Sequence, residues 1–305
     1  MEARQHTSGR AFINRHAVLV FYVSVLALGL GPFLIGAFLG TTGFLGTDAE
    51  LTSAADLDPL MYVVAVLAGP LGYTLAAVLV IALAFGRAGL RDLGSRLIRW
   101  RVGVRWYAVA LLTAPLLMAA ILGALSLTSD AFLPAILTAD DKGSLLLAGL
   151  VAGLVAGFFE EIAWTGFATH ELRKRHGLLA TGLLVGLPWC LLHLPLVAGA
   201  DSGGVPPVLS VAVALFSVLL PYRVLMVWVY DRTKSVLIAM LMHLPITAGA
   251  FILASPARVG VSDLVYNLVL GATLWVLVAA VAAANRRKLS QPSLINPVRS
   301  PRVSR

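Results

Sequence analysis

Long apolar stretches alternate with short polar segments along most of this chain, and the alternation predicts its helices. A transmembrane helix needs about 20 mostly apolar residues to cross the hydrocarbon core of a bilayer. Windows of this kind lie near residues 17–40, 60–86, 107–126, 144–168, 178–199, 207–230, 235–254 and 263–284. The pattern predicts an all-α polytopic membrane protein, a bundle of about eight transmembrane helices occupying residues 17–284. The first window is expected to be a retained helix, because acidic residues and seven more windows follow it.

One polar segment, residues 87–106, has a helical pattern of its own. Leu90, Leu93 and Leu97 recur at helical spacing, and arginines such as Arg91 and Arg96 stand between them. Basic amphipathic helices of this type lie in the membrane interface. We therefore expect an interfacial basic helix over 87–106, although a basic connector that only fixes topology fits the same residues.

The positions of the charges predict the orientation in the membrane. If the N-terminus is cytoplasmic, 21 of the 23 Lys and Arg residues fall in or next to cytoplasmic segments, and only Lys142 and Arg258 fall outside them. The loops expected on the outer side instead carry most of the aspartates. Lys and Arg are enriched in cytoplasmic loops of membrane proteins. Both termini are therefore predicted to be cytoplasmic.

The composition excludes a soluble globular protein. Apolar residues make up 59% of the chain and charged residues 12%, whereas soluble domains carry about 25% charged residues. The net charge is +8, and the positive residues lie mainly in the segments next to the membrane. The charge therefore indicates membrane lipids as partners and no nucleic acid. Residues 1–16 and 285–305 are basic tails, and we expect the second to be disordered and attracted to anionic head groups. No internal repeat is visible.

Five ionisable residues lie at membrane depth within the apolar windows, and they define the candidate site. They are Glu160, Glu161, His193, Arg223 and His243. A charged side chain at membrane depth costs at least about 2.5 to 3.5 kcal/mol, so such residues face one another or a wet cavity. We therefore predict that these five side chains, from four helices, share one polar site.

Helical spacing adds neighbours to this site. Residues four apart on a helix lie on one face. The pairs are Glu160 with Trp164, Glu161 with Thr165, Trp189 with His193, and His243 with Thr247. The glycines Gly149, Gly153 and Gly157 repeat at the same spacing, and this pattern predicts close packing of their helix against another.

The residue types indicate two kinds of chemistry. Adjacent carboxylates removed from bulk water do not easily both ionise, and one of them is suited to accept a proton from water. Two histidines opposite them would stabilise an oxyanion or bind a metal ion. This set is typical of a hydrolase, but a proton relay in a transporter uses the same groups.

The motifs "EEIAWTGF", "WCLLH" and "HLPIT", in this order on three apolar windows, resemble those of the CPBP family of intramembrane proteases. This family includes the type II CAAX prenyl endopeptidases and bacteriocin-immunity relatives. The resemblance extends over about 87–247 and implies a protease-like core at 87–254. It implies that Glu160 activates water and that Glu161 assists it. His193 and His243 are implied to stabilise the oxyanion or, in another view, to bind zinc, with Trp189 at the aromatic position.

Two positions depart from the pattern of the family. Thr165 stands where many members have Arg, and Thr247 stands where Asn or Asp is usual. We therefore hypothesise that Arg223 supplies the missing counter-charge to Glu161. No His-Glu-x-x-His motif or cysteine set favours a tight metal site, and zinc, if bound, would be held by His193 and His243.

The sequence thus predicts an intramembrane endopeptidase that cleaves membrane-associated or lipidated, CAAX-like peptides near the cytoplasmic face. The bias towards Ala, Leu and Arg favours a bacterial chain and a multi-pass protein of the cell membrane. A non-proteolytic scaffold or bacteriocin-immunity protein of the same fold is the first alternative, and the departures at Thr165 and Thr247 favour it. A proton-coupled transporter is the second alternative, and the absence of repeats counts against it.

Overall fold

The computed structural model describes residues 12–29, 31, 59–194 and 203–284, and in this part of the chain every regular element is a helix. The longer elements are α2 (Ala17–Gly29), α4 (Pro59–Leu97), α5 (Val104–Ser126), α7 (Lys142–Ala163), α9 (Leu178–Leu192), α12 (Leu220–Thr233), α13 (Val236–Ile252) and α14 (Val261–Ala284). Shorter ones are η2 (Asp130–Phe132), α6 (Ala135–Thr138), η3 (Trp164–Thr169), α8 (His170–Leu172), α11 (Pro207–Ala212) and η4 (Val213–Leu219).

The helices confirm a polytopic all-α membrane protein. Five continuous helical stretches are long and apolar enough to span a bilayer: Gly69–Leu97, Val104–Ser126, Lys142–Leu172, Pro207–Thr233 and Val261–Ala284. The helices α2, α9 and α13 are apolar but shorter. Each of these three shorter helices falls within one of the windows predicted from the sequence. Most of the tails predicted at 1–16 and 285–305 lies outside the described residues.

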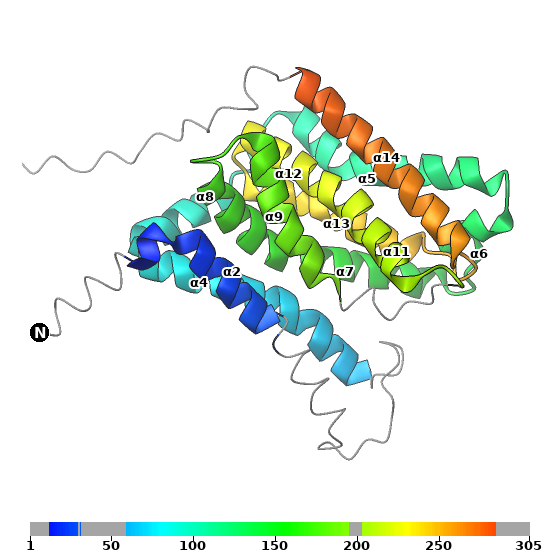
Figure 1. The fold of residues 1–305 in the computed structure, drawn as a ribbon, viewed down its shortest axis with the longest axis horizontal. Helices are drawn as coiled ribbons and strands as arrows, with labels where there is room; N and C mark the ends of the chain where they lie inside the picture. Colours follow the sequence, from blue (N-terminus) through cyan, green and yellow to red (C-terminus); the bar gives the residue numbers. More distant parts are fainter. Residues whose placement is uncertain (1–11, 30, 32–58, 195–202, 285–305) are drawn as a thin grey trace, which may run out of the picture.

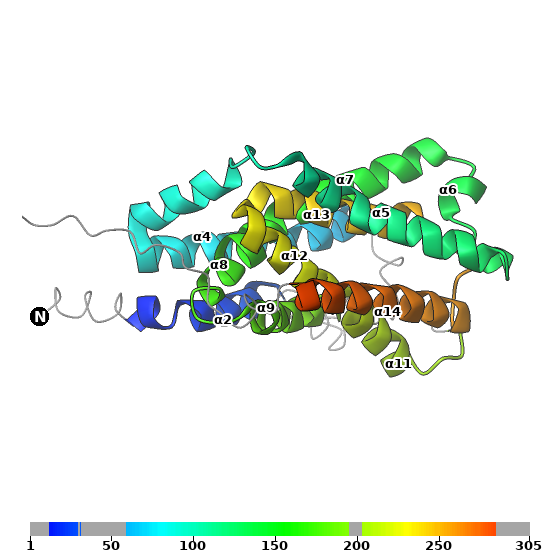
Figure 2. The same ribbon diagram turned by 90° about the horizontal axis from the view of Figure 1, so that it is seen from above.

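The two central helices of the bundle are α12 and α13. Figure 1 shows both near the middle of the bundle, and in Figure 2 they lie between α5 and α7 on one side and α9 and α14 on the other. The closest neighbours of α13 are α7 and α5, whereas α12 packs mainly on α9. The helices α2 and α4 pair along one edge. The site described below is built where α7, α9, α12 and α13 meet.

The glycine pattern on α7 determines how closely α13 approaches it. A Cβ atom added at Gly153 would lie 2.5 Å from the backbone oxygen of Leu244, and one at Gly157 would lie 2.8 Å from that of Met240. At Gly149 it would lie 2.6 Å from Ile252. The predicted small-residue packing face is therefore confirmed, and it brings the backbone of α7 directly onto that of α13.

Capping fixes the start of α7. The carboxylate of Asp141 accepts a hydrogen bond from the backbone N–H of Ser144 at 2.9 Å, in the manner of an N-cap residue. Hydrogen bonds from Ser144 hold the pKa of this exposed carboxyl below its usual value. The helix therefore begins directly after the last acidic residue of the preceding loop.

The helix predicted over 87–106 covers only part of that range. A helix covers 87–97 as the last part of α4, after a break at Gly86, where φ is 63° and ψ is −154°. Glycine tolerates this backbone conformation far better than other residues do. Residues 98–103 are not helical, and α5 begins at Val104. Arg96 is 5% exposed and donates to the backbone oxygen of Gly166 at 2.7 Å, so this arginine does not face head groups.

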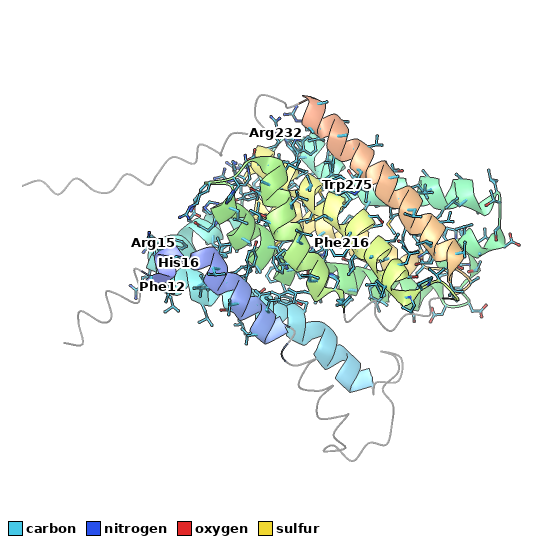
Figure 3. The ribbon with its side chains drawn as sticks, in the orientation of Figure 1. Phe12, Arg15, His16, Phe216, Arg232 and Trp275 are labelled. Atoms are coloured by element: carbon cyan, nitrogen blue, oxygen red, sulfur yellow. The ribbon has the colours of Figure 1, made fainter. Side chains whose placement is uncertain are left out.

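Two arginines, Arg15 and Arg232, lie toward the same end of the molecule. Figure 3 shows Arg15, close before α2, and Arg232, near the end of α12, toward the end that lies opposite α6. Lys142, one of the two exceptions to the predicted charge distribution, begins α7 at the α6 end. The orientation of the bundle in the membrane stays a prediction from the charge pattern.

Candidate functional site

The two adjacent glutamates stand in the last turn of α7 and point in different directions. Successive residues on an α-helix are about 100° apart. Glu160 is 6% exposed and lines a cavity, whereas Glu161 is fully buried among other polar groups. The helix then widens into the π-helical turns of η3. The two carboxylates therefore have different surroundings.

Glu161 is held by three partners from three helices. Its Oε2 atom lies 2.9 Å from Nη1 of Arg223 on α12 and accepts a hydrogen bond from the hydroxyl of Thr165. Its Oε1 atom lies 2.7 Å from Nδ1 of His243 on α13. The predicted pairing of Arg223 with Glu161 is therefore confirmed, and so is the contact of Thr165. These hydrogen bonds compensate a carboxylate that has lost all contact with solvent.

Arg223 also links the two glutamates through Trp189. Its guanidinium carbon lies 4.1 Å from the centroid of the Trp189 ring, a cation–π contact between two fully buried side chains. The indole Nε1–H of Trp189 donates to Oε2 of Glu160 at 2.7 Å. Trp189 therefore fixes one oxygen of Glu160.

In both histidines Nδ1 is bound to a protein oxygen, which leaves Nε2 for the cavity. Nδ1 of His193 lies 2.8 Å from the backbone oxygen of Trp189, and Nδ1 of His243 faces Glu161. A carbonyl oxygen and an ionised carboxylate only accept hydrogen bonds, so both Nδ1 atoms carry hydrogen. Nε2 is then the atom left to interact with a ligand in each ring. Because α9 ends at Leu192, His193 lies at the helix end rather than deep within the predicted 178–199 span.

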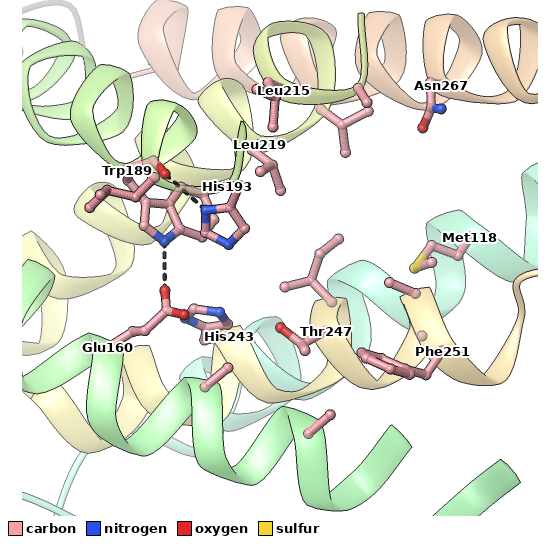
Figure 4. Close-up of a pocket in the computed structure, with 18 of the residues that line it drawn as sticks. Met118, Glu160, Trp189, His193, Leu215, Leu219, His243, Thr247, Phe251 and Asn267 are labelled. Carbon is pink, nitrogen blue, oxygen red and sulfur yellow. Dashed lines mark hydrogen bonds between the residues drawn. The ribbon is translucent and has the colours of Figure 1, made fainter. Parts of the chain in front are cut away.

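A cavity of about 460 Å³ extends from these groups between the helices. Glu160, Trp189, His193 and His243 lie at one end of it, and Thr247 follows one turn along α13 (Figure 4). The lining beyond Thr247 is mostly apolar, with residues such as Ile246. The site thus combines a few polar groups with an apolar channel, which is typical of pockets for amphipathic ligands.

One predicted neighbour lies elsewhere. Trp164 does not contact the carboxylate of Glu160. Its ring packs edge-to-face on Phe21 of α2 with centroids 5.6 Å apart, and it also meets Tyr22 and Tyr73. This side chain anchors α2 and α4 to the core instead of orienting a reactive group.

A second polar cluster was not predicted. His170 is buried in α8, and its Nδ1 lies 2.9 Å from the hydroxyl of Tyr230. Arg96 contacts the same hydroxyl at 3.2 Å and pairs with Asp92. Apolar residues at helical spacing around Arg96 gave no sign that it faces inward. This cluster joins the end of α4 to α8 and α12, outside the site.

The two histidines raise the question of whether the site holds zinc. An Nε2 atom facing a cavity, with Nδ1–H bound to a carboxylate or carbonyl, is typical of metal-ligating histidines. Structural and catalytic zinc sites nevertheless use three or four protein ligands. Within the described residues no group of three His, Cys, Asp or Glu side chains is arranged to hold a metal ion. The site therefore does not fit such a zinc centre, and the mechanism below involves none.

Comparisons with known proteins agree with the motif positions. Residues 142–249 match the family described as type II CAAX prenyl endopeptidase Rce1-like. A curated relative, CAAX prenyl protease 2 from Methanococcus maripaludis, is 29% identical over 105 residues, which are 33% of this chain. The matched part is 39% of the relative's length. The matched segment contains all four residues Glu160, Glu161, His193 and His243. Through this segment the chain is similar to the CAAX prenyl proteases, in agreement with the resemblance of its motifs to those of the CPBP family.

Proposed function

We propose that the protein is an intramembrane endopeptidase in which Glu160 activates water to hydrolyse peptide bonds of membrane-associated or lipidated peptides. The observation that carries the proposal is the difference between the two glutamates. Glu161 is engaged by Arg223, His243 and Thr165, whereas Glu160 has one oxygen bound to Trp189 and faces the cavity. Glu160 is therefore the carboxylate available to take a proton from water.

Charge balance assigns the other roles. Arg223 carries one positive charge, and two ionised glutamates carry two negative charges, so a buried site with neutral histidines has a net charge of −1. A proton on His243 restores neutrality, and Glu161 stabilises this imidazolium through Nδ1. The Nε2–H of His243 then donates to the oxyanion that forms when water attacks the peptide carbonyl. His193, one turn after Trp189, is positioned beside the same carbonyl.

One proton passes from water to Glu160 and then to the leaving amine. Glu160 removes a proton from water as the new C–O bond forms and the carbonyl oxygen becomes negative. The C–N bond then breaks, and protonated Glu160 returns the proton to the leaving amine. Thr247 lies one turn beyond His243 along the cavity, and its hydroxyl provides a donor for the backbone of the peptide. Arg223 and Glu161 act as positioning residues.

The cavity and the similarity to CAAX prenyl proteases support a proposal for the substrate class. A largely apolar cavity among membrane helices favours an apolar or lipid-modified peptide over a soluble polar one. The relative's name, CAAX prenyl protease 2, supports CAAX-like lipidated peptides. We place the protein as a multi-pass protein of a bacterial cell membrane, with the site accessible from the cytoplasmic side and membrane lipids as its surroundings.

Reconstituted protein and a library of membrane peptides test the proposal. Wild type in liposomes is expected to release products, with lipidated peptides cleaved faster, and Glu160→Gln to release none. Glu171→Gln is the matched control, because Glu171 lies on α8 and pairs with Lys174. If wild type cleaves no peptide although it folds, the endopeptidase proposal fails. The departures at Thr165 and Thr247 then favour a non-proteolytic scaffold, and proton-driven substrate uptake into the same vesicles would indicate a transporter.

A further inference from the structure

The wall of the cavity includes a tyrosine that the proposed mechanism does not use. Tyr73 of α4 lines the same cavity as Glu160, Trp189 and His193. Its side chain is buried in the protein, and its hydroxyl has no hydrogen-bond partner among the described residues. A buried hydroxyl without a partner is costly, so such groups usually bind water or a ligand. The Tyr73 hydroxyl therefore requires an explanation beyond packing.

The ring of Tyr73 is held at the level of Glu160. Its centroid lies 5.9 Å from that of Trp164, which follows the glutamate by one helical turn. The next residue of α4, Thr74, donates a hydrogen bond from its hydroxyl to the backbone oxygen of Phe159, the residue before Glu160. These contacts join α4 to α7 beside the glutamate. Tyr73 is close enough to Glu160 for the charge of the carboxylate to act on its hydroxyl.

A glycine leaves room for this hydroxyl. Side chains on a helix point toward the N-terminus of the helix, and the Tyr73 hydroxyl reaches Gly69, one turn earlier on α4. A Cβ atom added at Gly69 would lie 3.2 Å from the hydroxyl oxygen, which is closer than ordinary contact. Gly69 also lines the cavity. The hydroxyl therefore lies at the cavity wall, next to a residue that has no side chain.

The attacking water needs a second partner in addition to Glu160. Trp189 donates to Oε2 of Glu160, so Oε1 is the oxygen left to receive a proton from water. The other hydrogen of that water also needs an acceptor, and a tyrosine hydroxyl accepts hydrogen bonds as well as donating them. With one hydrogen on Glu160 and one on Tyr73, a lone pair of the water is free to attack the peptide carbonyl.

We propose that Tyr73 is a further catalytic residue, whose hydroxyl holds the attacking water together with Glu160. The inference rests on the proposed endopeptidase function. Tyr73 accepts a hydrogen bond and transfers no proton, so the path of the proton from water through Glu160 to the leaving amine is unchanged. Because the hydroxyl acts on the water and not on the peptide, its loss lowers kcat and leaves KM nearly unchanged.

Tyr73→Phe in the full-length protein in liposomes tests the proposal. The ring that packs on Trp164 is kept, so we expect a melting temperature close to wild type, kcat about tenfold lower and KM within about twofold. Tyr22→Phe is the matched control, because Tyr22 meets the same Trp164 ring but donates to the backbone oxygen of Leu184 at 2.8 Å and lies outside the cavity wall. If Tyr73→Phe has the same kcat as Tyr22→Phe, or if its loss lies only in KM, the proposal is overturned.

Gly69→Ala tests the position of the hydroxyl independently. The added methyl group displaces the hydroxyl, so we expect kcat to fall when Tyr73 is intact. In the Tyr73→Phe background no hydroxyl remains to be displaced, and the same substitution should change kcat by less than about twofold. Equal losses in the two backgrounds would overturn the proposal, because the glycine would then act through packing alone.

The infrared carboxylate band that Glu160→Gln removes reports the shared water without any cleavage. The frequency of such a band changes when a hydrogen-bonding partner is lost. We expect the band to move in Tyr73→Phe and to stay in place in Tyr22→Phe. If it moves although wild type cleaves no peptide, the water site stands and the endopeptidase function fails. An unmoved band in Tyr73→Phe overturns the proposal even if wild type is an active peptidase.

Discussion

The ion pair between Arg223 and Glu161 gives a sharp prediction about stability. Both side chains are fully buried, and the nitrogen and oxygen atoms are 2.9 Å apart. Arg223→Met removes the positive charge and leaves Glu161 buried beside a neutral side chain. Breaking a buried pair by removing one partner costs about 3 to 5 kcal/mol, because the remaining charge is uncompensated. We therefore expect a loss of this size in the free energy of unfolding.

A double-mutant cycle in detergent measures the pair itself. Arg223→Met, Glu161→Gln and the double variant are unfolded together with wild type, and their free energies of unfolding are compared. The double variant removes both charges, so we expect its loss to be smaller than the sum of the single losses by about 2 kcal/mol. Arg232→Met is the matched control, because Arg232 is exposed on the same helix, and we expect a change within about 0.5 kcal/mol.

Two results would refute this reasoning. If Arg223→Met is as stable as Arg232→Met, then Arg223 does not compensate Glu161. If the two single losses simply add in the double variant, the residues contribute independently and the contact carries no pairing energy. Either result would remove Arg223 from the account of how Glu161 is kept ionised.

Four further predictions concern single contacts and metal. Trp189→Phe keeps an aromatic side chain but removes the N–H bound to Glu160, so we expect kcat to fall about tenfold or more. Thr165→Val removes one hydrogen bond from a buried carboxylate and should lower the free energy of unfolding by about 1.5 to 3 kcal/mol, measured against wild type. Gly153→Ala overpacks the α7–α13 contact and should cost about 1 to 3 kcal/mol, whereas Gly123→Ala, where the space is open, should not destabilise the protein. Removal of divalent metals with a chelator should leave the cleavage rate within about twofold of the untreated protein, and a loss restored by zinc would contradict the metal-free mechanism.

The helices could be predicted because lipid requires long apolar segments, and such segments are visible in the sequence. Where one helix breaks inside a window or continues beyond it was harder to predict. The break at Gly86 depends on a backbone conformation that follows from tertiary packing. The inward direction of Arg96 depends on an acceptor at Gly166, 70 residues away in sequence. Local spacing contains no information about such a partner.

The members of the site were predictable for a related reason. Ionisable groups are costly at membrane depth, so Glu161, Arg223 and His243 were expected to pair with one another. Which glutamate faces the cavity was not predictable from the residues alone, because Glu160 and Glu161 are adjacent and of one type. The aromatic packing of Trp164 and the place of Tyr73 in the cavity wall were also missed. Both depend on how distant helices pack, which helical spacing does not describe.

The cleavage rate of Glu160→Gln on the best wild-type substrate tests the central claim most directly. Gln keeps the size of the side chain and still accepts a hydrogen bond from Trp189, but it does not take a proton from water. General-base catalysis contributes about 10² to 10⁴ in rate, so we predict that kcat falls at least about 100-fold while substrate affinity and melting temperature stay close to wild type. A folded Glu160→Gln protein that cleaves within about tenfold of the wild-type rate would contradict the account.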